Sequence, residues 1–526
     1  MTRAGLARGA MWFGIIITVG LLVVTFLFMH AESTWVHTRA MGPEEAFHYS
    51  STGTELMPLP VFQVLPIIFP DQFQPGGASA GDWVDQFGFI RGKAGVNEGL
   101  PQGFFVSNYR PRSGSPSPVP FVGINCSLCH SSRIRRSDND PGVVVPGMGS
   151  TSLDFIAWVD GFKTAVLDKR RMTADNIIDT YEQHFGKKLD LSEKLMIRLW
   201  LVQTRKTVEQ TEPKVDSPYG GADLRNSALM PNGPSRTQPF RNLVRNIMNR
   251  PAALDRGFCK LPVLYEQKDR EWGQFDGSVR DRLTRSVLAA MAIGATMENL
   301  SMPTISANVQ HSIDYTLDLK GPKYSEIFPD QKIDGARVAR GEKVYLTYCD
   351  SCHGHPDAQG AWVKGKQQGV VFPYQEIGTD RERVTFRYYD VLADSLYEWF
   401  PAKQPLRPKR EDLRLGPMGT VRGYIGSPLV SAFSHAPYLH NGSVPTMAEL
   451  INLKPRRNVY YRGDNLYDPV DMGLIVPGQP DLKRYFRFDA TERGNSNQGH
   501  DYPWSYKGKG WNQADLQDLL EYLKTI

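Results

Sequence analysis

The chain has 526 residues, of which 41% are hydrophobic and 22% are charged. These proportions are typical of a folded protein with two or three domains, and they exclude a disordered chain. The net charge of +5 is small for this length. Acidic and basic residues are also interspersed, so we expect no nucleic-acid partner. Gly (48) and Pro (37) are frequent, which predicts long irregular connections.

An uncharged run from Gly9 to Met29 follows Arg3 and Arg8 near the N-terminus. At about 1.5 Å per residue a helix of this length reaches roughly 31 Å, which is enough to cross the hydrocarbon core of a bilayer. The basic residues precede the run, which places the rest of the chain on the far side. We therefore expect residues 1–30 to anchor the protein in a bacterial cytoplasmic membrane, with the bulk of the chain in the periplasm. A cleaved signal peptide is the alternative.

Four of the 5 cysteines lie in two C-x-x-C-H motifs, CSLCH at 126–130 and CDSCH at 349–353. A disulfide, a metal site and covalent haem attachment compete for such a motif. Paired zinc-binding units usually lie much closer together in a chain, and a redox disulfide needs no histidine. Haem c uses both thiols and the histidine. The sequence therefore predicts two covalently bound haem c groups, the first on Cys126, Cys129 and His130 and the second on Cys349, Cys352 and His353. The fifth cysteine, Cys259, is expected to be a buried, unreactive thiol.

Helical periodicity dominates the rest of the chain. A helix that leads into the second motif and a C-terminal helix after Asn512 are how cytochrome c domains enclose haem. Further helical spacing follows Thr173, a candidate N-cap. We find no run of alternating strands. The sequence therefore predicts a mainly α fold with two cytochrome c-like haem domains at 31–329 and 330–526, preceded by one transmembrane helix.

Several short stretches occur in one order along the chain, among them VGINCSLCH, REWGQFDGS, APYLHNGSVPT and GNSNQGHDY. Together they resemble the bacterial di-haem cytochrome c peroxidase superfamily, especially the branch that is similar to the di-haem rubber oxygenases. The resemblance covers nearly everything from about residue 45 onward. It implies one haem in each of two domains. The C-terminal haem would be six-coordinate and pass electrons, and the N-terminal haem would meet peroxide or oxygen.

The resemblance also bears on the sixth ligand of the second haem. Many peroxidases of the family place a methionine before the GNS turn, where this chain has Arg493, and arginine has no free lone pair for iron. In the oxygenase-like branch the ligand is the histidine that closes GNSNQGH, here His500. His440 in PYLHNGS is the second choice and could instead bond a haem propionate. The remaining candidates are His435, Met418, Met447 and Met472.

For the first haem the sequence offers few ligands. Only His184 and His311 lie between the two motifs, and both are expected to be ordinary surface or packing residues. An open sixth position is therefore expected, as in the oxygenase-like branch. Trp272, Phe275 and Asp276 match the family's aromatic-Asp-Gly stretch. They could line the pocket or relay electrons, and the alternative is that the aromatic residues belong to the core.

These features predict an exported di-haem oxidoreductase. Peroxide or oxygen would be activated at the N-terminal haem, with electron transfer through the C-terminal haem. The expected partners are a periplasmic or membrane redox protein and a small oxidant, together with the membrane itself. One alternative is a membrane-tethered electron carrier without substrate turnover. Another is a maturation factor that oxidises a side chain of a partner protein.

Overall fold

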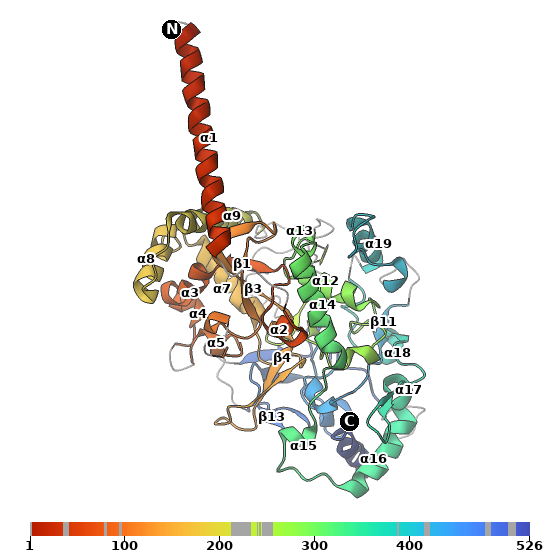
Figure 1. Ribbon diagram of the computed structural model, residues 1–526. Coiled ribbons are helices and arrows are strands. Elements are labelled where there is room, and N and C mark those ends of the chain that lie inside the picture. Colours follow the sequence, from red (N-terminus) through yellow and green to blue (C-terminus); the bar gives the residue numbers. More distant parts are fainter. Residues whose placement is uncertain are drawn as a thin grey trace.

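In the computed structural model one long helix projects from the rest of the chain (Figure 1). The structure describes residues 3–34, 41–77, 81–93, 97–211, 233–238, 240, 243–244, 256–386, 389–414, 421–478, 485–502 and 512–526. The N-terminal elements are α1 (Arg3–Thr34), α2 (Pro43–Tyr49), β1 (Glu55–Pro58), α3 (Leu59–Ile68), α4 (Pro70–Phe73), α5 (Trp83–Gln86), η2 (Asn97–Gly99), β2 (Phe104–Tyr109), β3 (Pro116–Ile124), α6 (Cys126–Cys129), β4 (Ser131–Ile134), β5 (Val143–Pro146), α7 (Phe155–Leu167), α8 (Ala174–Phe185) and α9 (Leu191–Thr211).

The rest of the chain continues the same mixture of helices and short strands. Its middle part contains β6 (Arg236–Thr237), β7 (Cys259–Lys260), η3 (Gln267–Asp269), α12 (Arg282–Ala292), α13 (Met297–Leu300), α14 (Pro303–Asp318) and α15 (Tyr324–Ile327). The C-terminal part contains α16 (Gly335–Tyr348), α17 (Asp350–His353), β8 (His355–Pro356), β9 (Trp362–Val363), β10 (Val371–Pro373), α18 (Tyr374–Ile377), α19 (Tyr389–Trp399), η4 (Arg410–Asp412), β11 (Gly423–Ile425), η5 (Ala432–His435), α20 (Met447–Leu450), β12 (Val459–Arg462), β13 (Tyr467–Asp468), β14 (Gly473–Leu474), β15 (Phe486–Asp489) and α21 (Gln513–Leu523).

The predicted fold class, mainly α after a transmembrane helix, is wrong. The structure is 43% helical and 14% strand. No helix formed by the described residues is long and apolar enough to cross a membrane.

The largest sheet has three strands and was not predicted from the sequence. Strand β3 lies between β1 and β2 and pairs antiparallel with both. Nearly every residue of β3 is buried, so the strand reads as a continuous apolar run without the alternation that marks a half-exposed strand. Strand β3 ends at Ile124, two residues before Cys126. The sheet thus delivers the chain directly into the first motif.

Helices α16 and α21 pack across each other at the second motif, as the sequence predicted. Asn512 caps α21 by accepting a hydrogen bond from the Asp515 N–H, and Arg340 of α16 is paired with Asp518 of α21 at 2.6 Å. At Gly341 the helices approach so closely that a Cβ would lie 2.0 Å from the Asp518 carbonyl oxygen. Helix α16 then runs into Cys349, which fixes the second motif against the C-terminal helix.

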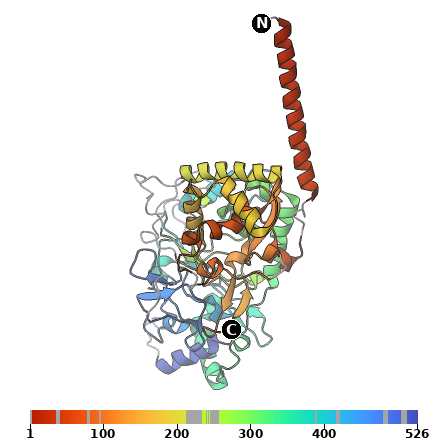
Figure 2. The ribbon, with the colours of Figure 1, turned by 90° about the vertical axis from the view of Figure 1, so that its left-hand side faces the viewer.

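Three large clusters of buried apolar side chains form the core. The first joins the β1–β3 sheet to α3, α7, α8 and α9, and Figure 2 shows α9 lying across the end of the body from which α1 projects. The second surrounds α12, α14 and α19. The third joins α16 and α21 to residues of β4 and β5 as well as to the segment around Tyr265. This third cluster contains residues from both sides of position 329. It therefore does not test the domain boundary predicted there, which stays a prediction.

We predict that Gly341→Ala destabilises the protein by about 1–3 kcal/mol, because the added methyl group must displace backbone of α21. Gly335→Ala is the matched control, since a Cβ there meets nothing within 4 Å, and we expect it to be neutral or stabilising by up to about 1 kcal/mol. Urea unfolding of the purified protein measures both. Equal stability of the two variants would contradict the close approach of the helices.

Candidate haem sites

The two C-x-x-C-H motifs have the same local structure. Each forms one turn of helix, α6 and α17 respectively. In the first, the backbone N–H of His130 donates to the carbonyl of Cys126 at 3.0 Å. In the second, His353 donates to Cys349 at 3.0 Å. One turn therefore carries both thiols and the imidazole, which is the set of groups that haem c needs.

The two motif histidines are also held in the same way. Nδ1 of His130 is hydrogen-bonded to the carbonyl oxygen of Pro262 at 2.8 Å. Nδ1 of His353 is bonded to the carbonyl oxygen of Ser427 at 2.7 Å. Burial lowers the pKa of His130 to about 4 and also lowers the pKa of His353. A neutral imidazole that donates from Nδ1 keeps the lone pair of Nε2 for a metal.

The motif cysteines are free thiols in an apolar setting. None of the five cysteines forms a disulfide. Burial raises the pKa of Cys126 to about 11 and the pKa values of Cys129 and Cys349 to about 12. Cys259 is buried, as the sequence analysis expected.

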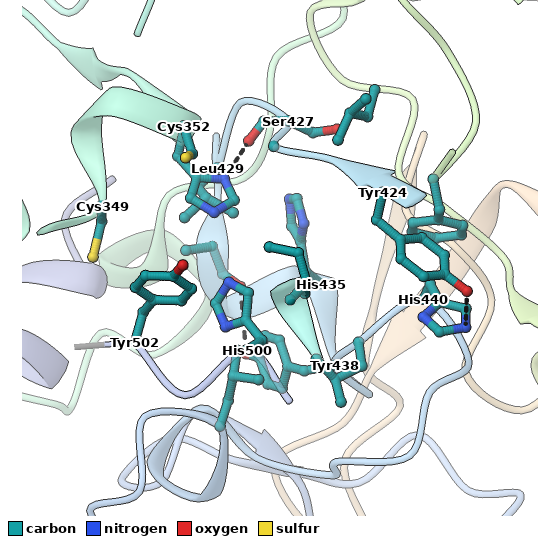
Figure 3. Close-up of a pocket in the computed structure, with 18 of the residues that line it drawn as sticks. Cys349, Cys352, Tyr424, Ser427, Leu429, His435, Tyr438, His440, His500 and Tyr502 are labelled. Atoms are coloured by element: carbon teal, nitrogen blue, oxygen red, sulfur yellow. Dashed lines mark hydrogen bonds between the residues drawn. The ribbon is translucent and has the colours of Figure 1, made fainter. Parts of the chain in front are cut away.

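A large cavity opens beside the second motif (Figure 3). Its described lining is mostly aromatic and aliphatic, with no aspartate or glutamate in it. Figure 3 shows the two motif cysteines at one side of the cavity and Tyr424 and His440 at the other. The lining includes Lys260, Arg270, Phe275, Cys349, Cys352, His353, Tyr424, His435, His440, Met447, His500 and Tyr502.

His500 faces the second motif histidine. The ring centroids of His353 and His500 lie 6.1 Å apart, with an angle of 61° between the ring planes. Two metal–imidazole bonds of about 2.0 Å each, with roughly 1 Å from each nitrogen to its ring centre, span about 6 Å. The separation therefore fits one iron between the two rings, as in a six-coordinate bis-histidine haem.

The loop that carries His500 is fixed by close backbone contacts. The N–H of His500 donates to the carbonyl of Ile377 at the end of α18, at 2.7 Å. Gly499 has a φ of +80°, and a Cβ there would lie 2.2 Å from the backbone of Gly378, so this approach requires glycine. Arg456 donates to the Gly499 carbonyl at 2.7 Å. Burial lowers the pKa of His500 to about 3, which keeps its imidazole neutral.

The other candidate ligands are engaged elsewhere. His440 is stacked on Tyr424, with ring centroids 4.2 Å apart, and its Nε2 is hydrogen-bonded to the Tyr424 hydroxyl at 3.0 Å. Nε2 of His435 donates to a backbone carbonyl at 3.0 Å. Met447 lines the cavity, and Met472 is buried in the third core cluster. Met418 lies outside the described residues. Arg493 is paired with Glu382 at the surface.

Two cations line the same cavity, and of these Lys260 is buried and Arg270 is partly buried. Lys260 is 7% exposed, and its ammonium group donates to the carbonyl of His435. Arg270 donates to the carbonyl of Pro428 at 3.3 Å. Among the described residues neither side chain pairs with a carboxylate, and burial lowers the pKa of Lys260 to about 7. A buried cation needs an anion, so the cavity fits a group such as haem that carries carboxylates on a flat apolar body.

A hydrogen-bonded cluster supports the first motif, and the sequence analysis did not identify it. His48, Gln102 and Ser131 converge on the Ser127 hydroxyl within α6, at distances of 2.9–3.0 Å. Nothing near His48 in the sequence resembles a motif, because the cluster is assembled from α2, the turn before β2, and β4. The cluster positions the helix that bears both thiols.

His184 and His311 lie away from the first motif. His184 lies on α8, with its ring against Phe185, and His311 is bonded to the backbone of Met41. Among the described histidines none stacks on His130. His48 contacts the first motif only through the Ser127 hydroxyl, whereas His500 faces the ring of the second motif histidine itself.

The three predicted relay residues lie on the side of the second motif. Phe275 lines the cavity of that motif. The Arg414 guanidinium lies over Trp272, 3.5 Å from the ring centroid. Asp276 is fully buried against the guanidinium of Arg383 at 3.3 Å. Their roles stay predictions, and the contacts found here connect only Phe275 to a haem cavity.

Comparison with known protein families matches one segment of the chain. Residues 423–462 match a family model described as RoxA-like, cytochrome c-like. The matched stretch contains His435 and His440 and forms part of the cavity wall. It supports a RoxA-like cytochrome c and haem c binding. It gives no support to the wider di-haem peroxidase superfamily, and it does not establish the number of haems.

Two curated relatives come from Sinorhizobium fredii. The uncharacterized protein y4iM is 28% identical over 50% of this chain and 64% of its own length, so the chain spans less than two thirds of that relative. The uncharacterized protein y4iJ is 22% identical over 91% of this chain and 90% of its own length. Neither name states an activity.

We predict that His500→Ala converts the second haem from low spin to high spin, because one axial imidazole is lost. His440→Phe is the control, since His440 is stacked on Tyr424, and we expect it to leave the low-spin signal in place. Electron paramagnetic resonance of the oxidised proteins measures both. A low-spin signal that survives in His500→Ala and disappears in His440→Phe would reverse the assignment.

The buried histidines also predict the pH dependence of stability. Burial holds the pKa of His435 well below its usual value, so the unfolded chain takes up this proton first as the pH falls. The stabilisation is present above about pH 6.5 and is lost below it, by up to about 1.4 kcal/mol per pH unit for each such histidine. We expect His435→Gln to lose less stability between pH 6.5 and 5 than the unmodified protein in urea unfolding. An equal or larger loss would contradict this assignment.

Proposed function

We propose that the protein is a di-haem c-type cytochrome oxidoreductase that activates peroxide or oxygen at the haem held by His130. Electrons would pass through the haem held by His353 and His500. The observation that carries this proposal is the difference between two otherwise matching motifs. His353 faces His500 at 6.1 Å, whereas none of the described histidines stacks on His130. Two axial imidazoles suit electron transfer, and a single one leaves a position for a small oxidant.

The protein residues prepare each axial imidazole for this role. The carbonyls of Pro262 and Ser427 fix the tautomers of His130 and His353, and they make the opposite nitrogen of each ring a stronger ligand. When bound, haem supplies the one-electron chemistry that no side chain provides. Leu128 and Cys129 of α6 pack against the first core cluster, which keeps water from that face of the motif.

The electrostatics of the second cavity suit a site that stores electrons. Its described lining has no carboxylate and contains the cations Lys260 and Arg270. Positive charge near a haem favours the reduced iron, because reduction adds a negative charge. The second haem would thus receive electrons from a donor and hold them for the first.

The partners and the compartment belong to the same proposal. A redox protein would deliver or accept electrons, and a small oxidant would react at the first haem. We place this chemistry outside the cytoplasm of a bacterial cell, since that is where haem is joined to C-x-x-C-H motifs.

A haem assay followed by low-temperature electron paramagnetic resonance tests the proposal. We expect two haems c per chain and, in the fully oxidised protein, one high-spin signal beside one low-spin signal. Cyanide should convert the high-spin signal to a low-spin one and leave the original low-spin signal unchanged. Two low-spin signals that neither cyanide nor half-reduction alters would favour an electron carrier without substrate turnover. A single haem per chain would overturn the di-haem assignment.

A further inference from the structure

One short segment contacts both motifs. Residues 259–264 begin in β7, which pairs with β6, and continue as an extended chain. The carbonyl oxygen of Pro262 accepts the hydrogen bond from Nδ1 of His130 in the first motif. Both Lys260 and Pro262 line the cavity of the second motif. A single stretch of a few residues therefore reaches the axial histidine of one site and the cofactor cavity of the other.

The segment is fastened at both ends. The Lys260 N–H donates to the carbonyl of His440 at 2.8 Å, which ties one end to the second cavity. At the other end, Leu264 donates to the carbonyl of Gly147 at 2.7 Å, and Gly147 in turn donates to the carbonyl of His130 at 2.7 Å. A displacement of Lys260 is therefore transmitted along the chain and not absorbed by a free loop.

We propose that residues 260–264, here called the bridging segment, couple the two haem sites. Lys260 takes a propionate of the second haem, and Pro262 sets the orientation and basicity of the first haem's axial His130. Both are positioning residues. The inference rests on the proposed presence of two haems and adds to it a defined route between them.

The chemistry of Lys260 supports the first half of this proposal. Its ammonium group is buried, it bonds only to the carbonyl of His435, and it pairs with no carboxylate of the described chain. The coupling follows from the covalent path, because Pro262 lies two residues beyond Lys260. A change in the bond between Pro262 and His130 alters the electron density at the iron and with it the reduction potential.

Arg270 provides a matched control. It is a second, partly buried cation of the same cavity, but it belongs to a different segment. Its guanidinium donates to Pro428, which follows the residue that bonds to His353, Ser427. Loss of Arg270 therefore disturbs the second site without breaking a hydrogen bond of the bridging segment.

The test compares Lys260→Met with Arg270→Gln in the full-length protein that carries both haems. Spectroelectrochemical titration gives the midpoint potential of each haem, and resonance Raman spectroscopy of the reduced protein gives the iron–histidine stretching frequency of the first. Both variants should lower the potential of the second haem, since each removes a positive charge. Only Lys260→Met should also shift the stretching frequency and the potential of the first haem.

Lys260→Arg keeps the positive charge. Its midpoint potentials and its iron–histidine stretching frequency should therefore lie near those of the unmodified protein. Pro262→Ala is the reciprocal variant. It loosens the backbone at the bond to His130, so it should shift the stretching frequency first and the potential of the second haem as well. If Lys260→Met fails to fold, Pro262→Ala still tests the coupling of the two haem sites.

A Lys260→Met protein whose first haem is as unperturbed as that of Arg270→Gln would overturn the coupling and leave the di-haem function standing. A haem assay that finds one haem per chain would instead overturn the function itself. The two failures are therefore distinguishable before any activity is measured.

Discussion

The structure depends on one repeated interaction, a hydrogen bond from the Nδ1 atom of a buried histidine to a backbone carbonyl. At each motif this bond selects the tautomer that leaves Nε2 available, and burial keeps the ring neutral. The two carbonyls come from segments far from the motifs in the chain. The core that holds Pro262 and Ser427 in place is therefore part of the machinery of both sites. A c-type motif without such a partner could bind haem covalently and still misalign its iron ligand.

The sites differ in what stands opposite the histidine. The loop that carries His500 is pinned to α18 at Gly378 and Ile377, which leaves the imidazole little freedom to move away. In the proposed function, a site held so rigidly would change little on reduction and would favour fast electron transfer. The first site combines a similarly oriented histidine with a wall of sheet and apolar helices. Two motifs of the same sequence pattern thus lie in different surroundings.

Much of this arrangement could be predicted from the sequence. Both C-x-x-C-H motifs, the crossed helices and the caps at Thr173 and Asn512 are local signals. The choice of His500 came from a family resemblance, and the structure brings that histidine opposite His353. By contrast, Lys260 and Pro262 carry no signal, because long-range packing alone brings them to the sites. Strand β3 was missed since burial on both faces removes the alternation by which strands are recognised.

The position of His500 near the end of the chain has a consequence for assembly. The first motif is flanked by β2 and β3, which are close to it in sequence, but its histidine also needs the carbonyl of Pro262, 132 residues downstream. The second motif waits for a residue about 150 positions downstream, and contacts over such separations form late. In the proposed di-haem protein, a haem joined to Cys349 and Cys352 would therefore acquire its second imidazole last. Until then that site would itself be open to oxidants.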